Sequence, residues 1–295
     1  MSYRTDTPST TPHWAEGLAL GCAGVLCFSG TAPATRVAGP VFGSATLTCA
    51  RIVIAAVLGI LTLALLKRPR FPGRQHLPGL LAAGLGQAVG YPLFLALALQ
   101  RVPAYHGAVV IGLVPAATAV LSAIRTGERP TPRFWLACLL GFAVVLGFAL
   151  VQGGGSVQLA DGWLLAAVLS TAVGYVEGAT VARRIGGTRT LCWSMLLLAP
   201  VASALLVILG MPAGPASAWV GLVYAGVASM FVGSVLWFRA LATGGTARIG
   251  QLNLAQPFLA IIWSALLLGE HLTWLVPVSA ALVLGCMAIC LNSRG

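Results

Sequence analysis

Two amides, Asn253 and Gln256, stand in an apolar stretch near the end of the chain. With Ala260 and Ser264 they are spaced by three, four and four residues, which places all of them on one face of a helix. Each amide offers both donors and acceptors, a combination suited to the ammonium or the carboxylate of a zwitterionic ligand. Two interpretations stay open: the amides bind substrate, or they hydrogen-bond between helices and hold them together.

Aromatic and amide side chains next to glycines form a second group, at Gln87, Tyr91, Tyr175 and Trp237. Gln87 and Tyr91 are four residues apart and therefore share a helix face. An aromatic ring beside a glycine leaves room for a flat ligand to stack on it. We expect these four residues to bind substrate together with the two amides, the alternative being packing or contact with lipid.

Two charged residues, Arg51 and Glu177, lie inside apolar runs. Arg51 is suited to hold a substrate carboxylate, or else it pairs with a carbonyl or carboxylate and fixes its own helix. Glu177 is a candidate proton carrier or counter-ion to an ammonium group. In the alternative interpretation it lies near the cytoplasmic interface of the membrane and pairs with a basic group, since Arg183 and Arg184 follow within two turns.

Two prolines, Pro115 and Pro257, lie within apolar runs. A proline has no backbone N–H, so the carbonyl four residues earlier loses its helical partner. Such a break can act as a hinge or present a carbonyl to a ligand. A static kink is the alternative.

Nothing in the sequence predicts a catalytic centre, a metal or a cofactor. The six carboxylates are scattered, and the four histidines are expected to be loop or interface residues. There is no G-x-x-x-x-G-K-[ST] motif for nucleotide binding. The seven cysteines form no C-x-x-C pair, and we expect them to act as small apolar residues rather than disulfides.

The amino-acid composition indicates whether the helices that position these residues lie in water or in a lipid bilayer. The chain has 295 residues, of which 58% are hydrophobic and only 8% charged, and its mean hydropathy is +0.94. Soluble domains carry about 25% charged residues. The chain is therefore expected to be an integral membrane protein. Its net charge of +11 comes from basic residues between apolar runs, which favours orientation in a bilayer over nucleic-acid binding.

Ten apolar runs are long enough to span a bilayer, which needs about 20 residues each. The sequence predicts an all-α protein with transmembrane helices over 15–34, 42–66, 77–99, 104–125, 133–152, 162–182, 190–210, 217–239, 246–268 and 273–291. The first run is interpreted as a helix of the mature fold and not as a cleaved signal peptide, because Glu16-Gly17 has a faint counterpart at Asp161-Gly162.

Basic residues gather in alternate segments between these runs. With a cytoplasmic N-terminus, fourteen of the 17 lysines and arginines fall on the cytoplasmic side, whereas Arg36 and Arg101 fall outside and Arg51 within a span. This asymmetry is a strong positive-inside signal and predicts that both termini are cytoplasmic.

An internal repeat appears when the chain is shifted along itself so that Ala98 meets Ala240. The most telling matches are a proline within an apolar run and a Gly-Glu pair that follows it. The identical residues are Ala98-Leu99 with Ala240-Leu241, Pro115 with Pro257, Ser122-Ala123 with Ser264-Ala265, and Gly127-Glu128 with Gly269-Glu270. Each repeat holds five predicted spans. An odd number forces the second copy to insert upside down, an architecture that recurs in secondary transporters with substrate bound near the midplane.

These residues resemble the EamA domain of the drug/metabolite transporter superfamily, in two copies that cover the chain from about residue 15. The matching positions include the repeated residues above with Gly141, Gly147 and Gly285, and Arg51 in the second span also matches a family position. The resemblance implies a ten-helix, inverted-repeat fold with a cytoplasmic tail at 1–14, a first repeat at 15–152 and a second at 161–295. Helices three, four, eight and nine, with one and six, are expected to enclose a central cavity.

The resemblance further implies a carrier in the bacterial inner membrane that exports small metabolites by alternating access. Amino acids are the favoured cargo, aromatic and hydrophobic ones foremost. The expected partners are this small molecule and the lipid bilayer, without nucleic acid, and a monomer is compatible with the sequence. Two alternatives are a polytopic membrane enzyme, which the scattered carboxylates disfavour, and a channel or structural membrane protein, which the asymmetric polar residues disfavour.

Overall fold

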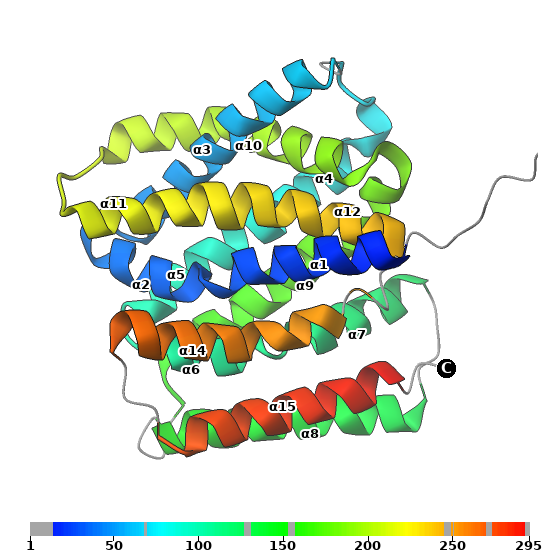
Figure 1. Ribbon diagram of the computed structural model, residues 1–295, viewed down its shortest axis with the longest axis vertical. Coiled ribbons are helices and arrows are strands. Elements are labelled where there is room, and N and C mark those ends of the chain that lie inside the picture. Colours follow the sequence, from blue (N-terminus) through cyan, green and yellow to red (C-terminus); the bar gives the residue numbers. More distant parts are fainter. Residues whose placement is uncertain are drawn as a thin grey trace, which may run out of the picture.

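The computed structural model describes residues 14–67, 70–126, 131–152, 157–244, 249, 251–269 and 273–292. Over these residues the chain is helical and contains no strand. In Figure 1 the helices α1, α14 and α15 run across the view, whereas α3 crosses it at a slant. The tail expected at 1–14 lies outside the described residues except for Trp14, and so do Glu128 and Glu270.

The first half of the chain forms long helices, several of them interrupted. Its elements are α1 (Trp14–Ser29), α2 (Thr31–Phe42), α3 (Ser44–Leu65), η1 (Arg74–His76), α4 (Leu77–Gly84), the π-helix η2 (Leu85–Gly90), α5 (Tyr91–Leu99), α6 (Ala104–Ile111), α7 (Val114–Thr126) and α8 (Pro132–Gln152).

The second half follows the same plan. Its elements are α9 (Leu159–Ile185), α10 (Gly187–Leu209), α11 (Ala216–Val223), the π-helix η3 (Tyr224–Gly233), α12 (Ser234–Gly244), the 3₁₀-helix η4 (Gln251–Ala255), α14 (Gln256–Leu268) and α15 (Leu275–Asn292). In Figure 1 the pair α3 and α10 lies at one edge of the bundle, and α8 and α15 lie side by side at the other.

Within the described ranges, seven helical stretches are long and apolar enough to cross a membrane. They are Ala15–Phe42, Ser44–Leu65, Arg74–Leu99, Ala104–Arg125, Leu159–Ile185, Gly187–Leu209 and Ala216–Thr243. The apolar runs in α8 and α14 are shorter, at Trp135–Phe148 and Phe258–Leu268. Large apolar side chains cover the outside of the bundle, with Leu65 and Val207 each 84% exposed. Such a surface suits lipid and not water, so the chain is a multi-pass membrane protein.

The first span is longer than the sequence predicted. The expected end at residue 34 was wrong, because α2 begins directly after Gly30 and continues to Phe42. Pro33 lies in the first turn of α2, where a missing N–H costs no helical hydrogen bond. The helix ends instead at Gly43, whose φ of 71° breaks the helical path.

The repeat of the sequence is visible in the bounds of the helices. The shift that places Pro115 on Pro257 also carries α7 (Val114–Thr126) onto α14 (Gln256–Leu268), residue for residue. Both helices follow a local break in the helical path, and each has its proline as the second residue. The π-helices η2 and η3 also interrupt corresponding stretches of the two halves.

One buried pair corrects the expectation for the histidines. His106 in α6 is only 2% exposed, and its Nε2 lies 2.6 Å from Asp161 Oδ1 at the start of α9. The other oxygen of Asp161 accepts the backbone N–H of Gln158 and so caps α9. His106 is therefore a core residue, because its partner, 55 positions along the chain, is brought to it by packing.

Candidate functional site

A narrow cavity lies inside the bundle and is lined by residues from both halves of the chain. The lining consists of Phe28, Arg51, Gln87, Ala88, Tyr91, Ile111, Val114, Thr171, Tyr175, Leu191, Met195, Ser229, Met230, Ser234, Asn253 and Gln256. Its volume is about 30 Å³, enough for water but far below the roughly 300–1,000 Å³ of a typical ligand pocket. In this conformation the site is contracted.

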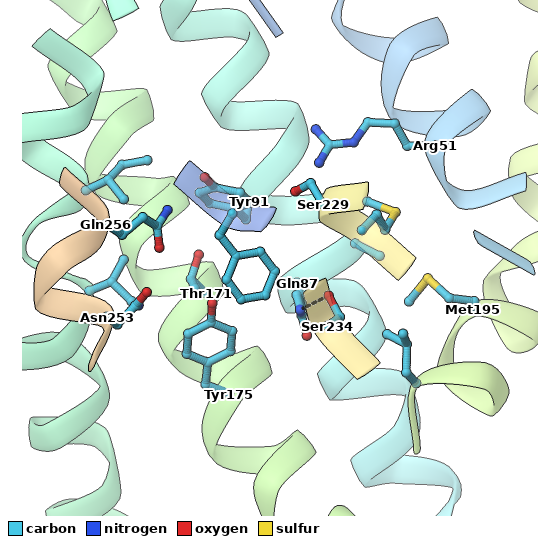
Figure 2. Close-up of a pocket in the computed structure, with 16 residues that line it drawn as sticks. Arg51, Gln87, Tyr91, Thr171, Tyr175, Met195, Ser229, Ser234, Asn253 and Gln256 are labelled. Atoms are coloured by element: carbon cyan, nitrogen blue, oxygen red, sulfur yellow. Dashed lines mark hydrogen bonds between the residues drawn. The ribbon is translucent and has the colours of Figure 1, made fainter. Parts of the chain in front are cut away.

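Five of the six residues expected to bind substrate line this cavity. Gln87 and Tyr91 come from η2 and α5, Tyr175 from α9, and Asn253 and Gln256 from η4 and α14. Figure 2 shows the amides of η4 and α14 on one side of the two tyrosines and Gln87 on the other. The structure therefore brings together side chains from opposite halves of the sequence.

Trp237 does not line the cavity and instead supports its wall. The indole is 1% exposed and packs edge-on against Phe28, with ring centroids 6.1 Å apart. Its centroid also lies 5.7 Å from that of the Tyr175 ring. Trp237 therefore positions two lining residues from behind.

The hydrogen bonds around the cavity connect its walls. Gln87 Nε2 donates to Ser234 Oγ over 2.6 Å, which ties η2 to the first residue of α12 (Figure 2). The hydroxyls of Thr31 and Ser229 share a second bond of 2.6 Å between α2 and η3. The two π-helices are thus joined by polar bonds to other elements at the level of the cavity.

Local helix geometry explains why polar groups reach this space. A π-helix leaves the regular helical pattern, and such segments occur frequently at functional sites. Both η2 and η3 supply lining residues. Pro115 and Pro257 are the second residues of α7 and α14, where a missing N–H costs no helical hydrogen bond, and they follow the breaks at which Ile111 and Asn253 line the cavity.

Two groups in the lining carry buried polar atoms without a partner in the part of the chain that the structure describes. They are Nε and Nη1 of Arg51, and Oδ1 of Asn253. The side chains of Arg51 and Asn253 lie on opposite sides of the site in Figure 2. The cavity therefore offers unused donors at one side and an unused acceptor at the other.

Glu177 lies outside the cavity lining and forms an ion pair. Its Oε1 accepts a hydrogen bond of 3.0 Å from Nε of Arg125 at the end of α7. The Arg125 side chain is 66% exposed and that of Glu177 21%. One interpretation of Glu177 was that it pairs with a basic group, and the structure shows such a pair. The basic residue, Arg125, belongs to another helix.

Several lining residues could not be found from the sequence. Phe28, Leu191, Met195 and Met230 are apolar residues in apolar helices, and nothing in their spacing separates them from lipid-facing positions. Ser234 carried a weak signal, as a small polar residue beside Gly233 at the end of a π-helix.

The chemistry of the lining suits non-covalent binding of a small molecule. Among the described residues that line the cavity there is no Asp, Glu, His, Cys or Lys. Over the described residues as a whole, no three His, Cys, Asp or Glu side chains come together in a way that could hold a metal ion. The polar groups that the described lining offers are amides, hydroxyls, one guanidinium and two phenol rings.

Comparisons with known proteins agree on the family to which this chain is similar. The model of the EamA-like transporter family matches the chain twice, over residues 15–150 and 158–292. The Bacillus subtilis (strain 168) protein named uncharacterized transporter YdeK is 41% identical over 290 residues, which cover 95% of this chain and 96% of that protein.

A second relative is the protein of Streptantibioticus cattleyicolor named probable terminal-alkyne amino-acid exporter. It is 28% identical over 276 residues, covering 90% of this chain and 88% of that protein. A solved crystal structure shares the fold with a TM-score of 0.67 at 21% identity, over 95% of this chain and 99% of the other.

Proposed function

Because the chain belongs to the EamA-like transporter family and is therefore a membrane transporter, we propose that it is a secondary carrier that exports small metabolites by alternating access. Amino acids are the proposed cargo, aromatic and hydrophobic ones foremost. The observation that carries this proposal is the cavity itself, whose lining combines one tyrosine and at least one amide from each repeat with hydroxyls from the second.

The proposed architecture has ten transmembrane helices in two five-helix repeats of opposite orientation. The shared bounds of α7 and α14, and the π-helices at corresponding places, support a duplicated unit. The two family matches divide the chain in the same way. Five spans per repeat is an odd number, so the second copy would enter the membrane upside down, with the cavity between the copies.

The proposed cargo chemistry follows from the polar groups of the lining. Tyr91 and Tyr175 present ring surface to an apolar or aromatic side chain. Asn253, Gln256 and Ser229 supply donors and acceptors for its polar groups. The relative named as an amino-acid exporter supports this choice of cargo.

The contracted cavity is consistent with a carrier that opens to one side at a time. With about 30 Å³ available, a metabolite enters only when helices move apart. Pro115 and Pro257 stand where two wall-forming spans are already broken, and we assign them the hinge role.

We place the carrier in the bacterial inner membrane with both termini in the cytoplasm. The distribution of lysines and arginines supports this orientation, and the two named relatives come from bacteria.

The test is flux through purified protein in liposomes loaded with labelled amino acids. We expect release of at least one aromatic or branched amino acid above the level of empty liposomes. Asn253→Ala should lower the initial rate about two- to tenfold, the worth of one lost hydrogen bond. The matched control is Thr180→Ala, because Thr180 bonds within α9 to the Val176 carbonyl and lies outside the lining. If aromatic, branched and small polar amino acids all fail to cross, the amino-acid cargo is wrong.

A further inference from the structure

A buried arginine faces the cavity. Arg51 lies two turns into α3, and its side chain is 2% exposed. Figure 2 shows its guanidinium reaching toward the space beside Tyr91 and Ser229. The charge is thus held inside the membrane-spanning bundle and directed at the proposed site.

This guanidinium has no counter-ion in the described part of the chain. Its Nε and Nη1 are buried without a hydrogen-bond partner. The three described carboxylates pair elsewhere, Glu16 with Arg239, Asp161 with His106 and Glu177 with Arg125. The remaining acids of the sequence, Asp6, Glu128 and Glu270, lie outside the described residues.

Another arginine shows what a structural role looks like in this fold. Nη1 of Arg36 in α2 donates to the carbonyl of Leu99 at the end of α5, which ties two helices together. Arg51 makes no such tie to a described residue through Nε or Nη1. A buried cation without a partner is costly, and the cost is offset when an anion reaches it.

We propose that Arg51 recognises a carboxylate of the cargo, so that this carrier requires a carboxylate and excludes amines that lack one. This inference rests on the proposed function and names its substrate class. A planar guanidinium binds a carboxylate through two parallel hydrogen bonds, which gives orientation as well as affinity. A cation without a carboxylate meets like charge in a water-poor site and is repelled.

The rest of the lining fits an oriented cargo. Asn253 Oδ1, the acceptor without a described partner, lies across the site from Arg51 and suits an N–H or O–H donor of the cargo. The two tyrosines lie between these groups and can contact the carbon skeleton. The carboxylate end of the cargo would therefore point toward α3 and α10, and the remainder toward η4.

The first experiment needs no cargo and asks whether Arg51 is structural. The melting temperatures of the parent and of Arg51→Met are compared in detergent without ligand. Methionine keeps a long flexible chain and removes the unpaired charge, so the variant should melt at the same temperature or higher. A clearly lower melting temperature than that of Arg74→Gln, which removes an exposed arginine, would show a structural role and overturn the proposal.

The second experiment measures flux of matched analogues. Liposomes are loaded with phenylalanine, with 3-phenylpropanoate, which lacks the amine, and with phenethylamine, which lacks the carboxylate. Leucine, 4-methylpentanoate and isopentylamine form a parallel set. We expect the parent to move compounds with a carboxylate and not the amines. Arg51→Gln should lower that flux at least tenfold, the worth of a charge-assisted hydrogen bond, with Arg51→Lys intermediate and Arg74→Gln unchanged.

The outcomes distinguish the proposed carrier function from the proposed recognition of a carboxylate by Arg51. Export of phenethylamine or isopentylamine, above that from liposomes without protein, at the rate of the amino acids, or full flux in Arg51→Gln, overturns the carboxylate rule and leaves the carrier function standing. Absence of flux for every carboxylate compound in the parent counts against the proposed amino-acid cargo. In that case the melting experiment still decides whether Arg51 is structural.

Discussion

The side-chain amide of Gln87 donates a 2.6 Å hydrogen bond to the hydroxyl of Ser234, 147 residues further along the chain. The bond connects the π-helix of the third predicted span with the residue that follows the π-helix of the eighth. It therefore joins corresponding spans of the two repeats at the wall of the cavity. Ser234 is 1% exposed, so water cannot easily replace the amide.

Breaking this bond from one side should cost stability. Gln87→Leu leaves the buried Ser234 hydroxyl without its partner, and we expect a loss of about 1–3 kcal/mol. Ser234→Ala should cost less than Gln87→Leu, because the half-buried amide of Gln87 lines a cavity large enough for water. The measurement is thermal unfolding in detergent as a double-mutant cycle, in which Gln87→Leu with Ser234→Ala should cost clearly less than the sum of the single changes. Additive losses would show that the two side chains do not depend on each other.

Close contact between η2 and α9 should make Gly174 intolerant of a side chain. A Cβ on Gly174 would lie 2.8 Å from the backbone nitrogen of Gln87, which cannot move without the helix. We expect Gly174→Ala to lose about 1–3 kcal/mol of stability through overpacking and to displace Gln87 in the cavity. Gly162 in the same helix is the control, since no described atom lies within 4 Å of its Cβ position and alanine there should be neutral or stabilising. Equal melting temperatures for both variants would contradict the close contact.

The buried pair of His106 and Asp161 should contribute more to stability than the surface pair of Arg125 and Glu177. Asp161→Ala removes the 2.6 Å bond to the His106 ring and also the cap on α9. Hydrogen bonds to charged groups contribute about 1.5–3 kcal/mol each, so we expect a large drop in melting temperature. Arg125→Gln should cost less than about 1 kcal/mol, as exposed ion pairs do. The reverse order would show that the buried pair is not a structural element.

Glu177→Gln distinguishes the two interpretations of this carboxylate. If its role is the ion pair with Arg125, the flux and its dependence on pH should match the parent, because Glu177 does not line the cavity. The measurement is the initial rate in liposomes from mildly acidic to mildly alkaline pH. A lost or shifted pH dependence, with Arg125→Gln unchanged, would instead assign Glu177 to proton coupling.

Much of the fold was predictable because it depends on local properties of the chain. Apolar runs of membrane length predicted the helices, and every predicted span contains helix over its described residues, although only seven described stretches are long and apolar enough to cross a membrane. The repeat, read from Pro115 and Pro257, reappears in the identical lengths of α7 and α14. The end of the first span was missed, since the sequence does not show that Gly43 takes a positive φ while Pro33 continues a helix.

The candidate site was partly predictable, because polar groups inside a membrane are costly and few. Gln87, Asn253 and Gln256 stood out for that reason, and all three line the cavity. The apolar lining residues, such as Phe28 and Met195, did not stand out. Their helices are apolar on most sides, so the sequence pattern does not tell which side faces inward.

From the sequence alone it followed that the chain lies in a membrane, that it is helical and that it contains a repeat. The sequence also singled out a short set of polar side chains within the apolar helices. Only the tertiary structure decided which of these groups meet. It gave Glu177 a partner in Arg125, 52 residues away, and His106 a partner in Asp161, while Arg51 was left facing the cavity without a described partner at Nε or Nη1. The reason is physical: the rotation and close approach of packed helices set contacts between distant residues, and local periodicity does not encode them.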